Sequence, residues 1–292
     1  MKDLIIEAHG INNPEVKCLD HGVVRLVDAM PRLVYDDDIN TCDHAVTQAA
    51  RVSYAYGTKK LNEDIGLIRY LMRHRHTTPT EMVEFKFHCK MPIFVARQQI
   101  RHRTASVNEL SARYSKMPEE FYIPEAEDLR AQSMANKQIS EGAIDLVDAE
   151  QWIQEVEEHC KKSYELYERG IDFGIGRELA RMVIPVNVYT EWYWKIDLHN
   201  LLHFLSLRCD SHAQKEIRVF ADAILTLIKP LIPHTIGAWN DYHPYRGGEL
   251  LSRMEMDAIR TFVVDGEFAE IDSENKREIK EWHDKCKILE LL

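Results

Sequence analysis

The segment from Met82 to Lys90 constrains the fold most, because apolar and polar residues alternate along it. Its apolar positions are Val83, Phe85, Phe87 and Cys89, and its polar positions are Glu84, Lys86, His88 and Lys90. A period of two places every apolar side chain on the same face of an extended strand. We therefore predict a strand that is buried on one face and open on the other.

Helical patterns lie on both sides of this strand. Residues 61–74 carry apolar side chains at intervals of three and four, which predicts a helix. Pro92 can begin the next helix, predicted for residues 93–103, because the first helical position needs no N–H. Asp197 is a predicted N-cap, and Ser211 with Gln214 forms a predicted capping box for the helix that follows. The other predicted helices cover residues 125–137, 149–167, 177–184 and 198–207.

Further strands are predicted at residues 23–27, near Tyr114, and at 186–196, where aromatic and β-branched residues gather. Strands and helices do not alternate strictly along the chain. This order favours an α+β fold with an antiparallel sheet and long packed helices over a parallel α/β fold. We expect a catalytic domain at residues 1–243. Residues 244–292 are more charged and weakly periodic, and we predict a C-terminal appendage there.

Charge and cysteine spacing limit the possible partners. The 292-residue chain has a net charge of −11, from 37 basic and 48 acidic residues. Such a chain repels nucleic acid unless its basic residues are clustered. The six cysteines form no CxxC pair, and unpaired thiols suit a reducing compartment, so we expect a cytoplasmic protein. We see no apolar segment long enough to span a bilayer and no secretion signal, so we expect no membrane partner.

Arginines form the most distinctive charged pattern. They are Arg101, Arg103, Arg113, Arg177, Arg181 and Arg208. The planar guanidinium donates two parallel hydrogen bonds to phosphate, so converging arginines would form an anion site. Alternatively, each arginine pairs with a nearby carboxylate such as Glu178 or Asp210. These residue types alone leave both interpretations open.

Histidines and aromatic residues offer two weaker signals. His199 and His203 are four residues apart on a predicted helix, but no HExxH glutamate lies between them, so we predict no metal site. An aromatic run could stack on a ligand ring, although such a run more often packs in a core or subunit interface, which we favour. The run consists of Tyr189, Trp192, Tyr193 and Trp194.

Residues 101–114 read RHRTASVNELSARY. This segment resembles RHRxxSxNExSxRY, the signature of the flavin-dependent thymidylate synthases. The resemblance extends over about residues 23–233 and includes HRHTTPTE at 74–81, PIFVARQQ at 92–99, LARMVIP at 179–185 and LSLRCDSHAQ at 205–214. It implies the fold of that family.

The resemblance also implies a reaction, the reductive methylation of dUMP to dTMP. Methylenetetrahydrofolate supplies the carbon, NADPH reduces a bound FAD, and tetrahydrofolate and NADP+ are the other products. Members of the family are usually homotetramers whose active sites combine several subunits. We therefore expect FAD as cofactor, small molecules as substrates and further copies of the chain as partners.

The family does not use a cysteine nucleophile on the uracil ring, and the signature segment contains no cysteine. By resemblance Arg208 is the catalytic residue that stabilises charge spreading through the ring. Ser111 has no histidine base at an obvious spacing, so we assign it hydrogen bonding, and we interpret Cys209 as a bystander. The residues that match dUMP contacts are Gln98, Arg101, Glu109, Leu110, Ser111, Ala112, Arg113, Arg181 and Arg208.

The residues that match FAD contacts are His76, Thr78, Arg101, His102, Arg103, Glu109, Asp197, His199 and His203. Three of them depart from the family pattern. Asp197 and His199 replace Asn-x-Arg, and His203 stands where asparagine is common. An aspartate near a pyrophosphate is unfavourable, so contacts from the backbone are the alternative here.

Two rival functions fit parts of the pattern. One is binding of single-stranded nucleic acid, with arginines on phosphates and aromatic rings on bases. The acidic balance of the chain and Glu109 inside the basic segment argue against it. The other is metal-dependent nucleotide hydrolysis by the histidines. Bound flavin would distinguish our favoured function from both.

Overall fold

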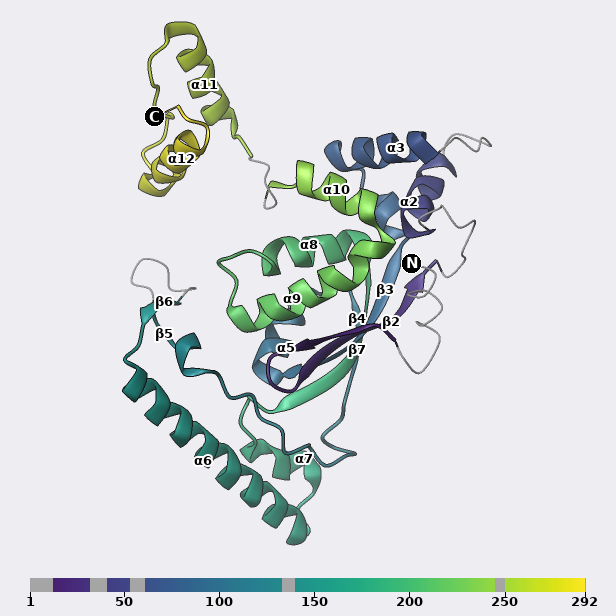
Figure 1. Cartoon of the computed structure of the whole chain (residues 1–292), viewed down its shortest axis with the longest axis vertical. Coiled ribbons are helices and arrows are strands. Elements are labelled where there is room, and N and C mark those ends of the chain that lie inside the picture. The colour runs from purple at the N-terminus through teal and green to yellow at the C-terminus, as the bar shows by residue number, and fades with distance from the viewer. Residues whose placement is uncertain (1–12, 32–40, 53–60, 133–139, 245–249, 292) are drawn as a thin grey trace. The chain divides into compact units, whose positions relative to one another are not determined.

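The computed structural model describes residues 13–31, 41–52, 61–132, 140–244 and 250–291. The chain forms two compact units, Met1–Arg246 and Gly247–Leu292. Within its described residues, the first unit combines helices with a five-stranded antiparallel sheet (Figure 1). The predicted α+β class with an antiparallel sheet is confirmed.

Strand β3 (Glu84–Pro92) lies at the centre of this sheet, and its apolar positions Phe85, Phe87 and Cys89 are fully buried. The prediction from alternation is therefore confirmed. The sheet order is β1-β2-β3-β7-β4, and every neighbouring pair is antiparallel. The other strands are β1 (Glu15–Cys18), β2 (Gly22–Met30), β4 (Ser106–Glu109) and β7 (Tyr189–Asp197).

The strand predicted near Tyr114 lies elsewhere. It is β4, on the sheet edge beside β7, and Tyr114 lies in a turn where its N–H donates to the Ser111 carbonyl at 3.0 Å. All four β4 residues are exposed. Because neither face of this strand is buried, β4 has no alternating apolar pattern, and pairing with β7 alone determines its place.

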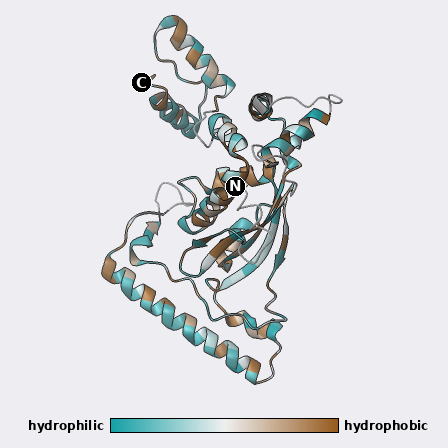
Figure 2. Ribbon diagram, turned by 45° about the vertical axis from the view of Figure 1, so that its right-hand side comes forward, coloured by the Kyte–Doolittle hydropathy of each residue, from teal (hydrophilic) through white to brown (hydrophobic). Residues whose placement is uncertain are grey.

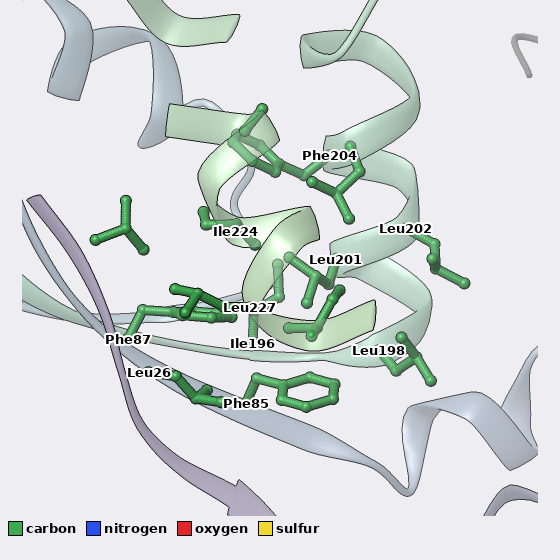
Figure 3. Close-up of a cluster of buried hydrophobic side chains, with 14 of the residues drawn as sticks. Leu26, Phe85, Phe87, Ile196, Leu198, Leu201, Leu202, Phe204, Ile224 and Leu227 are labelled. Carbon is green, nitrogen blue, oxygen red and sulfur yellow. The ribbon is translucent and has the colours of Figure 1, made fainter. Parts of the chain in front are cut away.

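Helices α8 (Leu198–Arg208) and α9 (Lys215–Ile228) cover one face of the sheet (Figure 1). Figure 3 shows Phe85 and Phe87 of β3 beside side chains of both helices. The Trp194 and Phe204 rings meet edge to face at 5.1 Å. Most of the aromatic run therefore packs in the core, as predicted, whereas Tyr193 is 49% exposed.

In the described part of the first unit, the remaining helices are α2 (Thr41–Arg51), α3 (Leu61–Arg73), α4 (Thr78–Glu81), α5 (Ile93–Gln99), α6 (Leu146–Asp172), α7 (Arg177–Ala180) and α10 (Pro233–Tyr242). Helix α3 confirms the prediction for residues 61–74. Helix α5 begins after Pro92, as predicted, but it ends at Gln99 rather than near residue 103. A 3-10 turn at Arg181–Val183 continues α7.

A second, smaller core forms where α6 packs on the chain that follows β4. The Tyr164 hydroxyl donates to the Met117 carbonyl at 2.9 Å, and the Met117 N–H donates to the Tyr167 hydroxyl at 3.1 Å. Both tyrosines and Met117 are buried. Figure 2 shows that much of α6 is otherwise hydrophilic. The predicted helix at residues 149–167 is confirmed, and α6 extends further at both ends.

Two local predictions are wrong. Residues 125–132 form no helix beyond a 3-10 turn at Ala126–Asp128; β5 (Arg130–Gln132) follows and pairs with β6 (Ser140–Ala143). Residues 133–137 of that prediction lie outside the described residues. Ser211 and Gln214 form no capping box, because Gln214 is itself the N-cap of α9 and its side chain does not cap the helix. The Gln214 amide bonds Gln98 and Glu216 instead.

The second unit contains α11 (Arg253–Asp265) and α12 (Lys276–Ile288). Trp282 is 1% exposed, and its ring stacks against Phe268 with centroids 6.3 Å apart. Ser252 and Glu255 form a capping box at the start of α11, and Lys285 of α12 pairs with Glu255 at 2.8 Å. Across the described parts of both units, no helix has the length and apolarity needed to cross a membrane.

Candidate active site

The signature segment, residues 101–114, connects the two cores of the first unit. It leaves α5, follows the sheet edge as β4, and turns beside α7. Ala105 packs against the main core, and Ala112 is buried in the second core. Several polar side chains between and beside these anchors are exposed, among them Arg101, Arg103, Glu109 and Arg113. The segment is therefore fixed by small apolar residues and leaves several charged side chains exposed.

Arg208 and His102 meet at the start of the segment. Arg208 is the last residue of α8, and its Nε donates to His102 Nε2 at 3.2 Å. Burial, together with the positive charge of Arg208 and the neighbouring His203, lowers the pKa of His102 to about 4. His102 is therefore neutral at physiological pH, with its proton on Nδ1, because Nε2 accepts the bond from arginine.

Burial also lowers the pKa of Arg208 from its ordinary value, with a contribution from the positive charge of Arg101. The His102 ring meets Phe204 edge to face at 4.9 Å, which holds the imidazole in place from the core side. Arg208 is thus a half-buried cation with a fixed neutral partner and another cation nearby. Such a group gains free energy when a negative charge develops beside it.

Three segments that match FAD contacts gather around α8. His203 lies with its ring 6.0 Å from that of His102, and helix α4, which contains Thr78, packs against α8. His76 precedes α4, is exposed, and meets the Tyr70 ring at 5.7 Å. The structure therefore places His102 of the signature segment and helix α4 against α8, whereas Glu109, at the end of β4, bonds Thr190 of β7.

Asp197 points its carboxylate back onto its own helix. Its Oδ1 accepts from the Asn200 N–H at 2.9 Å, and its Oδ2 accepts from Asn200 Nδ2 at 2.8 Å. The predicted cap is confirmed. Both oxygens therefore accept bonds within the first turn of α8, at a helix end that favours anions. Exposed Arg101 and Arg103 supply positive charge in the signature segment, and Arg101 lies close enough to Arg208, the last residue of α8, to lower its pKa. The residue types at both places fit a cofactor that carries a pyrophosphate.

Three arginines lie at the other end of the segment, beside α7. Arg113 Nε lies 3.8 Å from Glu178 Oε2, a weak ion pair. Arg177 donates to the Tyr114 carbonyl at 3.3 Å, and Arg181 donates to the Glu178 carbonyl at 3.4 Å. All three side chains are exposed. Of these arginines, only Arg113 has a carboxylate partner among the described residues, which leaves most of their donors for an anion.

The other dUMP candidates divide into side-chain and backbone groups. The Glu109 carboxylate accepts from the Thr190 hydroxyl at 2.7 Å, and the Ser111 hydroxyl accepts from the Arg113 N–H at 3.3 Å. The Leu110 N–H donates to the Glu191 carbonyl at 2.8 Å. Leu110 and buried Ala112 have no polar side chain, so they can offer only backbone groups to a nucleotide.

The structure does not join the two arginine groups directly. Among the described residues, no hydrogen bond or ion pair connects Arg208 or His102 with the arginines beside α7. Asp210 bonds His212 at 2.8 Å rather than Arg208, and no carboxylate of the described ranges forms an ion pair with Arg208. No cluster of three metal-ligating side chains occurs in the part of the chain that the structure describes.

Sequence reasoning missed the group around Gln98. The Gln98 amide bonds Gln214 at the start of α9, and Gln214 bonds Glu216. Gln214 is 116 residues away from Gln98 along the chain. The only local signal was a polar residue before a helix, and this pattern was interpreted as a cap.

A family model described as "Thymidylate synthase complementing protein" matches residues 33–234, more than half of the chain. The chain is 51% identical over 280 residues to a flavin-dependent thymidylate synthase of Dictyostelium discoideum, with 96% of this chain and 89% of the relative covered. It is 46% identical over 287 residues to the enzyme of the same description from Rickettsia bellii (strain RML369-C), with 94% and 93% covered.

A solved structure agrees with these relatives. The UMP/dUMP methylase PolB from Streptomyces cacaoi, bound with 5-Br dUMP, is similar with a TM-score of 0.67 and 35% identity. The similarity covers 78% of this chain and 98% of that one. The signature segment, the fold and these relatives agree, so the chain belongs to the flavin-dependent thymidylate synthase family.

Proposed function

We propose that this protein methylates dUMP to dTMP, with Arg208 as the group that activates the uracil ring. Methylenetetrahydrofolate is the carbon donor and NADPH the reductant, and the reaction yields dTMP, tetrahydrofolate and NADP+. The observation that supports the role of Arg208 is its bond to neutral His102, a predicted FAD residue that lies beside His203. This bond holds the Arg208 cation in place, which is what stabilising a developing charge requires.

Carbon 5 of uracil becomes a nucleophile when electron density moves into the ring, and negative charge then develops on the ring nitrogen and carbonyl oxygens. His102 occupies Nε of Arg208, so the two terminal NH2 groups of the guanidinium are left to donate to the base. A guanidinium fixed before the reaction needs little reorganisation as charge develops. Arg208 therefore acts by electrostatic stabilisation, without a covalent bond to the ring.

The cysteines support this route. Burial raises the pKa of Cys89 to about 12, so its thiol stays protonated and weakly nucleophilic. Cys89 is also fully buried within the sheet core. Cys209 follows Arg208 as the C-cap residue of α8, and our mechanism gives it no role in the chemistry.

We assign the phosphate of dUMP to Arg113 and Arg181. Both are exposed, and both retain donors that neither Glu178 nor the nearby carbonyls use. A phosphate dianion would compete with the weak pair between Arg113 and Glu178, since charge-assisted bonds to phosphate are shorter and stronger. Glu109, Ser111 and the backbone at Leu110 and Ala112 would hold the sugar and base.

FAD, when bound, supplies the hydride that completes the methyl group. His102, His203 and Thr78 lie around α8 to hold it, with Arg101 and Arg103 as cations for its pyrophosphate. Half-buried His199 and Asp197, which caps α8, lie at the helix end where backbone N–H groups face outward. His76 and Glu109 complete the proposed set.

Self-assembly into a homotetramer completes the proposal, with active sites shared between subunits. Apolar side chains are exposed beside the arginines of α7, including Phe173 at 75%, Leu179 at 61% and Met182 at 80%. Exposed apolar groups of this size favour burial against another copy. We place catalysis in residues 1–243 and treat 244–292 as an appendage, supported by a unit boundary between Arg246 and Gly247. We propose the cytoplasm as its location and no nucleic-acid or membrane partner.

Flavin absorbance and product formation test this function together. The purified protein should be yellow or bind added FAD, and dUMP should stimulate its oxidation of NADPH. With methylenetetrahydrofolate present, dTMP should accumulate in step with NADPH consumed. Colourless protein that takes up no FAD, or NADPH oxidation without dTMP, would contradict the proposal.

A further inference from the structure

Four side chains form a hydrogen-bonded chain that ends at Gln98, and we call Tyr122, Glu216, Gln214 and Gln98 the amide relay. The Tyr122 hydroxyl donates to Glu216 Oε1 at 3.1 Å, and Gln214 Nε2 donates to Glu216 Oε2 at 2.7 Å. Gln98 Nε2 then donates to Gln214 Oε1. Gln98 is one of the residues that we assign to dUMP.

The chemistry of the relay determines its direction. An ionised carboxylate only accepts hydrogen bonds, so Gln214 must turn its NH2 group toward Glu216. The carbonyl oxygen of Gln214 then faces Gln98, so Gln98 must donate to it through its own NH2 group. The carbonyl oxygen of Gln98 is therefore directed away from the relay. Among the described residues, this oxygen has no hydrogen-bond partner.

Two packed helices and a buried tyrosine hold the residues of the relay in place. Gln98 lies in α5, which packs against α9, and Gln214 and Glu216 are the N-cap and a first-turn residue of α9. Tyr122 is 7% exposed, and its ring lies 5.9 Å from that of Phe94. Burial, with Glu216 as a second cause, raises the pKa of Tyr122 well above its ordinary value. The tyrosine therefore stays a donor, and the carboxylate stays oriented toward both partners.

We propose that Glu216 is a positioning residue which, through Gln214, makes the carbonyl oxygen of Gln98 the atom offered to the nucleotide. This inference rests on the proposed dUMP site. Bound dUMP has two hydrogen-bond donors, the uracil N3–H and the 3′-hydroxyl, whereas its phosphate dianion and its carbonyls only accept. Through this carbonyl oxygen, Gln98 therefore accepts a bond from one of these two donors.

The variant Glu216→Gln reverses the relay with little change of shape. A glutamine at position 216 can donate to the Gln214 oxygen, which lets the Gln214 amide turn over. Gln214 then offers an NH2 group to Gln98, and Gln98 turns its own NH2 group toward the nucleotide. A donor now faces a donor, so the bond to dUMP is lost and the bound nucleotide keeps an unpaired group.

The test measures the Kd of dUMP for the FAD-loaded protein, by calorimetry or by the change in flavin absorbance. We expect Glu216→Gln to weaken dUMP binding about tenfold, the loss of one hydrogen bond with an unpaired donor left behind. Gln214→Met breaks the relay without reversing it and should weaken binding about threefold. Glu278→Gln is the matched control, because Glu278 is also a bonded first-turn glutamate but lies on α12; it should leave Kd unchanged.

Two nucleotide analogues identify which hydrogen-bond donor of dUMP bonds the Gln98 carbonyl oxygen. The monophosphate of deoxycytidine lacks the hydrogen on N3, and that of 2′,3′-dideoxyuridine lacks the 3′-hydroxyl. If Gln98 bonds the 3′-hydroxyl, Glu216→Gln and the unmodified protein should bind the dideoxyuridine analogue equally within about twofold. If it bonds N3–H, deoxycytidine monophosphate should bind more tightly to Glu216→Gln than to the unmodified protein, because its N3 accepts a hydrogen bond from the turned NH2 group. In either case, the other analogue should show the same weakening as dUMP.

An equal loss for dUMP and both analogues would overturn the proposal, because it would indicate general damage to the pocket. An unchanged Kd for dUMP in both relay variants would also overturn it. If the unmodified FAD-loaded protein bound no dUMP at all, the proposed function itself would fail, and that result is distinct from the other two. Flavin content and melting temperature verify that each variant is folded.

Discussion

The two ends of the signature segment hold their arginines in different ways. At the end near α5, Arg208 is half-buried, bonded through Nε to a histidine of lowered pKa, and backed by Phe204. At the end near α7, Arg113 and Arg181 are exposed, with one ion pair at 3.8 Å and one bond to a carbonyl at 3.4 Å. The same residue type is fixed at one end and loosely held at the other.

This difference corresponds to two functional roles, stabilising charge during the reaction and binding the phosphate. Stabilising charge that exists only during the reaction requires a group that is already in place, because reorganisation would cost free energy at each turnover. A phosphate brings its full charge into the site and can draw exposed, solvated arginines toward it. We therefore assign the rate of the chemistry to the Arg208 end and the affinity for the nucleotide to the α7 end.

The largest effect should follow Arg208→Ala, which removes the fixed cation. We expect kcat for dTMP formation to fall about 100-fold or more, the usual consequence of losing one preorganised group. Flavin absorbance should be retained, because α4 and the backbone of α8 remain. The control is Arg260→Ala, since Arg260 pairs with Asp257 on α11 and belongs to the second compact unit. A variant that kept its full kcat would show that we have assigned the wrong activating group.

Arg181→Ala should affect binding instead. We expect the KM for dUMP to rise about 10-fold to 100-fold, the loss of one charge-assisted bond to phosphate, with kcat at saturation nearly unchanged. The dependence of this KM on ionic strength should also become shallower, because one cation is missing. Steady-state kinetics at several salt concentrations measure both effects. A fall in kcat with an unchanged KM would reverse our assignment of the two ends.

The low pKa of His102 predicts a dependence of stability on pH. The pKa is about 4 in the folded protein, against an ordinary value of 6.5 that also applies to the unfolded chain. Between these values the unfolded state binds the additional proton, so this group lowers stability as pH falls from 6.5 toward 4. Melting temperatures of the unmodified protein and of His102→Gln, which does not titrate, should diverge in that window. Parallel curves across it would mean that His102 is not held neutral by the fold.

The smallest effect should follow Glu178→Gln at the loosely held end. This change removes the carboxylate that competes with phosphate for Arg113, so dUMP should bind about twofold more tightly. The gain is small because both groups are exposed and the pair is long. Titration of the FAD-loaded protein with dUMP measures it. Weaker binding would indicate that Glu178 positions Arg113 rather than competing for it.

The sequence predicted correctly those elements that depend on residues adjacent in the chain. The alternation in β3 and the cap at Asp197 depend on neighbouring residues, and both predictions are confirmed. The predictions for residues 125–132 and for the region near Tyr114 failed, because β5 and β4 are specified by their partner strands β6 and β7 and not by a pattern of their own. In particular, β4 is exposed on both faces and is held only by β7.

The same distinction applies to the site. The family resemblance identified Arg101, His102, Arg103 and Arg113 in the signature segment and Arg208 in a separate segment. It could not show that Arg208 bonds His102, because these residues are 106 positions apart and meet through the packing of α8 beside the segment. The amide relay was invisible for the same reason, since its link between Gln98 and Gln214 joins two helices that are distant in sequence.

Single-turnover formation of dTMP tests the assignment of the two ends most directly. The flavin is reduced beforehand, and saturating dUMP and methylenetetrahydrofolate are then added, so that neither NADPH oxidation nor nucleotide affinity limits the rate. We predict that Arg208→Ala forms dTMP about 100-fold more slowly than the unmodified protein, whereas Arg181→Ala matches it. Equal rates for Arg208→Ala and the unmodified protein, or a slow Arg181→Ala, would contradict the account.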